Sequence, residues 1–97
     1  MHVISRARLR DFWERHPDTQ TPLASWYRTA SKAAWRNLAE VRQSFNSADV
    51  VDQWTVFNIR GNRYRLIVRI DYVHQMIFIH DVLTHAEYDR GDWKHRS

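Results

Sequence analysis

The sequence predicts an α+β domain in which helices from the first half of the chain pack on a mainly antiparallel sheet formed by the second half. Two observations support this class. Apolar residues recur at helical spacing between residues 9 and 38, and three strand-like runs rich in β-branched and aromatic residues follow between residues 54 and 83. The short apolar segment Val3-Ile4 precedes both and is expected to form an edge strand. A single domain, 1–97, is expected from a chain of 97 residues.

The composition excludes several classes of protein. Without cysteine there is no disulfide scaffold and no cysteine-based zinc site, which fits a reducing cytoplasm. Neither a membrane-spanning run nor the apolar core of a signal peptide is expected. The balance of 15 Lys+Arg against 11 Asp+Glu gives a net charge of +4, and most of the cations are arginine. Because the guanidinium fork matches phosphate, this indicates an anionic partner, and nucleic acid is the first candidate. The simpler interpretation is a solvated basic surface.

Two helices and a shorter third are predicted. The first follows Ser5, which is expected to cap it, and ends before Pro17. The second is expected to begin with Thr21 as its cap and Pro22 in its first turn, where a missing N–H costs nothing. Its apolar stripe comprises Leu23, Trp26, Tyr27, Ala30, Ala33, Ala34 and Leu38.

After this stripe the pattern weakens. A short helix around Val41 and then a loop through Asp52 are expected. Trp35 lies off the stripe, and a packing role is favoured over contact with a partner because aromatic side chains more often serve packing.

Three strands are expected at Trp54–Ile59, Arg63–Ile70 and Met76–Leu83. Gly61-Asn62 tolerates positive φ and predicts a tight hairpin between the first two. The link between the second and third is longer and polar at its ends. The charged segment Gly91–Ser97 is expected to be a mobile tail unless Trp93 anchors it.

Strand alternation assigns the faces of the sheet. The middle strand should turn Tyr64, Leu66, Val68 and Ile70 towards the helices and Arg63, Arg65, Ile67 and Arg69 towards a face that stays partly open. If the second hairpin closes symmetrically around Val73, Arg65 falls opposite Asp81. Arg65 is then either one half of a cross-strand ion pair or a phosphate-binding arginine, and both interpretations remain open.

The segment Thr84–Asp89 has two interpretations. His85 and Tyr88 are three residues apart, so in a helical turn they project from the same side. The residues alone favour the simpler interpretation, in which Thr84 caps a short helix and Glu87 completes a capping box.

The alternative is chemical. Cleavage of RNA through its own 2′-hydroxyl needs a base, an acid and a positive charge near the phosphorane, and His85, Tyr88 and Arg65 are residues of those types. Asp81 or Asp89 could orient the imidazole. The spacing of the nearby histidines matches no standard metal-ligand pair, and no cofactor motif is present, so neither a metal nor a cofactor is expected.

Two linked motifs resemble those of a known family. Phe57-Asn58-Ile59 with Gly61-Asn62-x-Tyr64-Arg65-Leu66, followed by Thr84-His85-x-Glu87-Tyr88-Asp89, resemble the HigB-type toxins of bacterial type II toxin–antitoxin systems, within the RelE/ParE superfamily. The likeness extends to Trp35 and to Phe45-x-Ser47-Ala48-Asp49, and so covers most of the chain.

This resemblance implies a RelE-like fold and an mRNA interferase, a metal-independent endoribonuclease acting on mRNA at the ribosome. It also implies a HigA-type antitoxin with a helix-turn-helix, with operator DNA bound only through the antitoxin complex. Arg65 matches a strand arginine that the superfamily uses at the scissile phosphate, and His85 with Tyr88 falls where relatives place an acid–base group. The supporting residues would be Asp81 and Asp89. The expected RNA-binding residues are Lys32, Arg36, Arg60, Asn62, Arg63 and Arg69.

Two rival functions remain at this point. One is a non-catalytic ParE-like toxin with a protein target, and the other is an RNA-binding accessory protein without toxicity. Discrete new 5′ ends in mRNA would distinguish the interferase from both.

Overall fold

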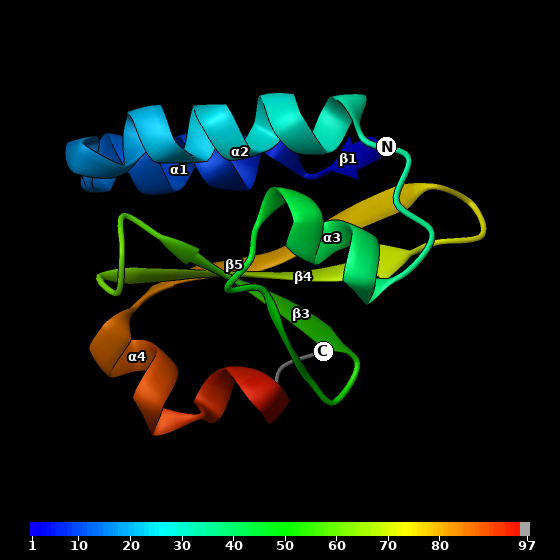
Figure 1. Ribbon diagram of the computed structural model, residues 1–97. Coiled ribbons are helices and arrows are strands. Elements are labelled where there is room, and N and C mark those ends of the chain that lie inside the picture. The colour runs from blue at the N-terminus through cyan, green and yellow to red at the C-terminus, as the bar shows by residue number, and fades with distance from the viewer. Residues whose placement is uncertain (96–97) are drawn as a thin grey trace.

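The computed structural model describes residues 1–95 as a five-stranded sheet with helices on both faces. The strand order is β1-β5-β4-β3-β2, with β1 parallel to β5 and every other neighbouring pair antiparallel. Figure 1 shows α1 and α2 covering one face, while α4 lies on the other. The predicted α+β class is therefore confirmed. The strands are β1 His2–Ile4, β2 Asp49–Val51, β3 Trp54–Ile59, β4 Tyr64–Asp71 and β5 Met76–Thr84.

The helical elements follow the predicted order. The α-helices are α1 Arg6–Arg15, α2 Gln20–Lys32, α3 Leu38–Ser44 and α4 His85–Arg90, and the 3-10 turns are η1 Pro17–Thr19 and η2 Asp92–His95. The predicted cap of the second helix, Thr21, is wrong, and Ser5 takes the N-cap position of the first helix without a capping side-chain hydrogen bond. Ser5 adopts a left-handed conformation (φ 71°) that turns the chain from β1 into α1, and its side chain makes no cap hydrogen bond. The second helix begins at Gln20, because η1 runs directly into it, and ends before Ala33.

The main core lies between α1, α2 and the sheet. Leu23, Trp26 and Ala30 of α2 are buried there, and Trp35 is buried as well, which confirms its packing role. Residues of β4 face this core in the predicted alternation, namely Tyr64, Leu66, Val68 and, partly buried, Ile70. The amphipathic pattern thus identified correctly which side of the sheet the helices cover.

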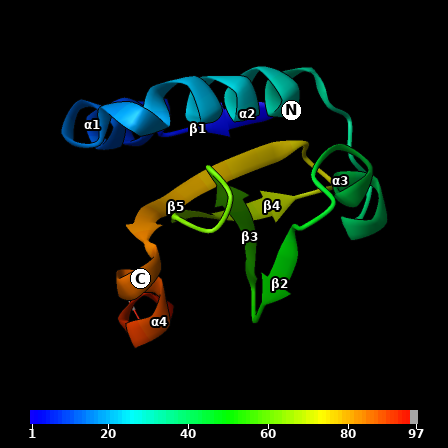
Figure 2. The same cartoon turned by 60° about the vertical axis from the view of Figure 1, so that its left-hand side comes forward.

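The second face is more covered than expected. We call it the far face, meaning the face of the sheet opposite α1 and α2. A second apolar cluster lies on it, formed by Trp54, Val56, Ile67, Leu83 and Trp93, with Val51 and Tyr88 packed against it. Trp93 belongs to η2 and is only 1% exposed, so it anchors residues 91–95 to the sheet. Figure 2 shows α4 below the sheet, on the side away from α1 and α2. Arg96 and Ser97 of the expected tail lie outside the described residues.

Three further details correct the expected strand pattern. Asp49–Val51, expected to be part of a loop, is the edge strand β2. The β3–β4 turn places positive φ at Arg60 (53°) and Gly61 (66°), one residue earlier than the predicted Gly61-Asn62. A bulge between Ile67 and Val68 shifts the β4–β5 register.

The β4–β5 register overturns the predicted pairing of Arg65 with Asp81. Arg65 lies opposite Leu83, and Asp81 lies opposite Ile67. Val68 then pairs with Ile79, so β5 holds one residue more than a regular ladder allows at this point. The hairpin also does not close symmetrically around Val73, since Asp71 pairs with Met76 and Arg69 with Phe78, so the turn and the bulge each shift the partner of Arg65 by one position.

Candidate functional site

The candidate site lies where β4 begins and β5 ends. Arg65 is the second residue of β4, and α4 starts directly after β5 with His85. The backbone N–H of His85 donates to the Arg63 carbonyl (3.0 Å), which joins the first turn of α4 to the start of β4. We call Arg65, His85, Tyr88 and Asp89 the edge cluster.

A capping box fixes the start of α4. The Thr84 hydroxyl accepts a hydrogen bond from the Glu87 backbone N–H (3.2 Å), and the Glu87 carboxylate accepts one from the Thr84 N–H (3.0 Å). Hydrogen bonding from the Thr84 backbone lowers the pKa of Glu87. The predicted capping box is confirmed. It orients the helix that carries His85 and Tyr88, so the two interpretations of this segment are compatible.

Replacing Thr84 by alanine should lower the free energy of unfolding by about 1 kcal/mol, because one backbone N–H of a short helix loses its acceptor. Urea unfolding followed by circular dichroism measures this. Thr21→Ala is the matched control, since Thr21 is exposed within α2 and should change stability by less than about 0.5 kcal/mol. Equal effects of the two substitutions would contradict the capping role of Thr84.

Arg65 and Tyr88 are in contact. The guanidinium carbon of Arg65 lies 5.4 Å from the centroid of the Tyr88 ring. The same guanidinium donates to the carbonyls of Asn62 (3.1 Å) and Tyr64 (3.2 Å), which hold it at the mouth of the β3–β4 turn. Burial raises the pKa of the Tyr88 hydroxyl, and the nearby Arg65 opposes this only in part. At neutral pH the phenol therefore keeps its proton beside a fixed cation.

His85 is paired with Asp89 across one turn of α4. The His85 Nδ1 and Asp89 Oδ2 atoms are 3.0 Å apart, and the two side chains are 52% and 59% exposed. Because the carboxylate engages Nδ1, Nε2 is the nitrogen that can exchange a proton with a ligand. Among the expected orienting carboxylates, Asp89 is therefore the one that contacts His85.

Asp81, the other expected supporting residue, lies away from this pair. Its Oδ1 accepts a hydrogen bond from the Val82 N–H (2.9 Å). It lines a groove beside α1 together with Arg8, Asp11, Phe12, Arg15 and Val82.

Trp93 supports the edge cluster from beneath, and only its anchoring role was expected from the sequence. Its ring stacks on that of Tyr88 (centroids 5.2 Å apart, planes at 16°), and its Nε1–H donates to the Tyr88 carbonyl (3.0 Å).

His80 lies between two tryptophans. Its Nε2 is 3.2 Å from the Trp93 carbonyl oxygen, and its imidazole stacks on the Trp54 ring with the centroids 4.1 Å apart. His80 thus has a packing role that no local sequence pattern indicated. Within residues 1–95 no three His, Asp or Glu side chains come together as a metal site.

Of the expected RNA-binding residues, Asn62 and Arg63 lie nearest the edge cluster. Both are exposed in the β3–β4 turn, and the Asn62 carbonyl accepts from Arg65. Arg69 is exposed four residues further along β4.

The other three expected RNA-binding residues are in other surroundings, although Arg60 belongs to the same β3–β4 turn. Arg60 is ion-paired with Asp18, which also accepts a hydrogen bond from the Tyr64 hydroxyl (3.0 Å). Desolvation opposes ionisation of Asp18, but the hydrogen bonds from Tyr64 and Arg60 outweigh it and lower the pKa of the carboxyl. Arg36 forms an ion pair with Glu40, with 2.7 Å between Nη2 and Oε2. Lys32 lines a cleft between α2 and α3.

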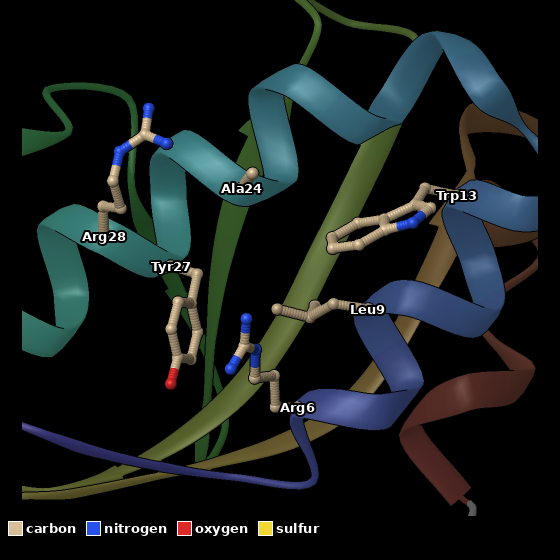
Figure 3. Close-up of a pocket in the computed structure, with 6 residues that line it drawn as sticks. All are labelled: Arg6, Leu9, Trp13, Ala24, Tyr27 and Arg28. Atoms are coloured by element: carbon tan, nitrogen blue, oxygen red, sulfur yellow. The ribbon is translucent and has the colours of Figure 1, made fainter.

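A separate pocket of about 180 Å³ lies between α1 and α2. Figure 3 shows its lining side chains between the two helices, with Arg6 beside the ring of Tyr27. The Arg6 guanidinium carbon lies 4.5 Å from the Tyr27 centroid. Among the described residues no carboxylate or imidazole lines this pocket, so it lacks the histidine–aspartate pair of the edge cluster. The lining residues are Arg6, Leu9, Trp13, Ala24, Tyr27 and Arg28.

The arrangement as a whole is a RelE-like α+β fold, with a mostly antiparallel sheet and a helical pair on one face. A short C-terminal helix brings a tyrosine and a histidine–aspartate pair next to an arginine, where β4 begins and β5 ends. No helix among residues 1–95 has the length and apolar character needed to cross a membrane.

Comparison with known proteins agrees with this class. The model of the HigB_toxin family, described as the RelE-like toxic component of a toxin–antitoxin system, matches residues 19–91. The mRNA interferase toxin HigB of Escherichia coli (strain K12) is 31% identical over 100 residues, which cover 100% of this chain and 96% of that protein. The mRNA interferase HigB of Shigella flexneri matches equally, and that of Escherichia coli O6:H1 is 30% identical over 93 residues, or 93% of this chain and 90% of that protein. The chain belongs to the HigB toxin family.

Proposed function

We propose that this protein is an mRNA interferase, an endoribonuclease that stops translation by cutting mRNA in the cytoplasm, with the ribosome as the place of action. The observation that carries the proposal is the contact of Arg65 with Tyr88 beside the His85–Asp89 pair, in a chain whose relatives are named mRNA interferases. A cation, a protonated phenol and an oriented imidazole are the groups that RNA transesterification needs.

The proposed reaction uses the substrate's own 2′-hydroxyl. His85 Nε2 takes the proton from that hydroxyl, the 2′-oxygen attacks the adjacent phosphorus, and the bond to the 5′-oxygen breaks. Tyr88 gives its proton to the leaving 5′-oxygen, so the products are a 2′,3′-cyclic phosphate and a 5′-hydroxyl. Arg65 stabilises the additional negative charge of the phosphorane. Tyr88 keeps its proton at neutral pH and so has one to give, and Asp89 supports His85 as the base. No step requires a metal ion.

The partner follows from the family. A toxin of this kind is held inactive by an antitoxin, and we propose a HigA-type antitoxin with a helix-turn-helix. Operator DNA would be bound only by the complex of the two proteins.

Primer extension on purified mRNA, with and without ribosomes, tests this function. The purified protein should produce discrete new 5′ ends, the fragments should carry 2′,3′-cyclic phosphates, and EDTA should not prevent cleavage. His85→Ala and Tyr88→Phe should each reduce cleavage while the circular dichroism spectrum stays unchanged. Intact transcripts accompanied by DNA damage would point to the ParE-like alternative, and RNA binding without cleavage would point to the accessory protein.

A further inference from the structure

The far face of the sheet carries a second pair of a cation and an aromatic ring, at the end remote from the edge cluster. Arg69 of β4 and Phe78 of β5 lie directly opposite each other in the ladder. The Arg69 guanidinium carbon is 4.3 Å from the centroid of the Phe78 ring. Arg69 is exposed and Phe78 is only half-buried, so both are accessible to a ligand.

This pair contributes little to the packing of the domain. Among the described residues, Phe78 belongs to neither apolar cluster, although its neighbours Ile77 and Ile79 are buried in the main core. A phenylalanine turned out of the core, with an arginine over its ring, forms a flat cationic and aromatic surface. Such surfaces bind unstacked bases by stacking and by cation–π attraction, with little dependence on which base is present.

The position of the pair relates it to the edge cluster. Arg65 and Arg69 are four residues apart on β4, which corresponds to about 13 Å along a strand. Between them on β4 lies Ile67, which belongs to the far-face cluster together with the buried Trp93. Two pairs of a cation and an aromatic ring therefore lie on the far face, formed by Arg65 with Tyr88 and by Arg69 with Phe78.

We propose that Arg69 and Phe78 form a base-stacking subsite for single-stranded RNA, reached by a nucleotide that is not adjacent to the cleaved phosphate. The proposal rests on the proposed function, since it takes the edge cluster as the place of cleavage. The subsite holds the strand on the far face and contributes to substrate binding, whereas the chemical step depends on Arg65, His85 and Tyr88.

Binding of a non-cleavable RNA tests the subsite separately from cleavage. Fluorescence anisotropy with a single-stranded oligonucleotide that carries 2′-O-methyl groups throughout gives Kd even if the protein proves not to cut RNA. Phe78→Leu, which removes the ring but keeps an apolar side chain, and Arg69→Gln should each raise Kd by about tenfold. The matched control is the pair Arg6 and Tyr27, which has the same chemistry on the helical side (Figure 3). Tyr27→Leu and Arg6→Gln should leave Kd within twofold.

Stepwise shortening of the oligonucleotide supplies the second readout. Once the strand is too short to reach from Arg65 to Arg69, parent and Phe78→Leu should bind equally. With cleavable RNA of full length, Phe78→Leu should raise KM and leave kcat within twofold. An unchanged Kd for both variants, a penalty that persists on the shortest strands, or an equal penalty for the Arg6 and Tyr27 controls would overturn the subsite. Thermal melting shows that each variant is folded.

Discussion

Replacing Arg65 by alanine should lower the rate of RNA cleavage by about 10²–10³-fold, because the phosphorane loses a positioned cation. The side chain is held by the carbonyls of Asn62 and Tyr64 and contacts Tyr88, so the charge is already in place before substrate arrives. Single-turnover cleavage of a labelled mRNA fragment measures the loss. The same substitution should relieve growth arrest when the toxin is expressed without an antitoxin.

Two further variants separate charge from position. Arg65→Lys keeps the charge but loses the planar fork, so its rate of RNA cleavage should lie between those of the parent and Arg65→Ala. Arg28→Ala removes an exposed arginine at the pocket between α1 and α2 and should cleave RNA at the parental rate. If Arg65→Ala cleaves as fast as Arg28→Ala, Arg65 has no role in the chemical step.

Replacing Trp93 by alanine should lower the free energy of unfolding by about 3–5 kcal/mol, because a buried indole is lost from the far-face cluster. For a domain of this size that corresponds to a fall in Tm of at least about 12 °C. Differential scanning calorimetry measures it. Tyr88 should also lose its stacking partner, which near-ultraviolet circular dichroism would detect.

Trp93→Phe provides the graded comparison. It keeps an aromatic ring under Tyr88 but removes the Nε1–H that donates to the Tyr88 carbonyl, so the loss should be about 1–2 kcal/mol. A Trp93→Ala protein as stable as the parent would mean that residues 91–95 do not pack on the sheet as described.

Local patterns predicted the strands well. The bounds of β3 agree with the prediction, and those of β4 and β5 agree within one residue, because alternating β-branched and aromatic residues end at polar turns. Strand β2 was missed because Asp49–Val51 has only three residues and follows a polar segment. The residue opposite Arg65 was predicted wrongly by two positions. One comes from the turn, which does not close symmetrically around Val73, and the other from a bulge, which is set by packing across the sheet and leaves no signal in the spacing.

The candidate site was predictable where its contacts are local. The capping box joins residues three apart, and the His85–Asp89 pair joins residues four apart, so both follow from helical spacing. The stack of His80 on Trp54 joins two strands with β4 between them, and its contact with Trp93 depends on where η2 packs. Tertiary contacts of this kind cover the far face of the sheet, and the local sequence does not contain them.

The parallel pairing of β1 with β5 also has a consequence for how the chain folds during synthesis. His2–Ile4 is made before the other strands, but its partner β5 is made only after β2, β3 and β4. The edge cluster likewise depends on α4 and on Trp93, which follow later still. Domains made from such distant contacts fold slowly and late. A chain that has not yet reached Trp93 therefore lacks both a closed sheet and an assembled site, which delays the appearance of a toxin until α4 and Trp93 have been made.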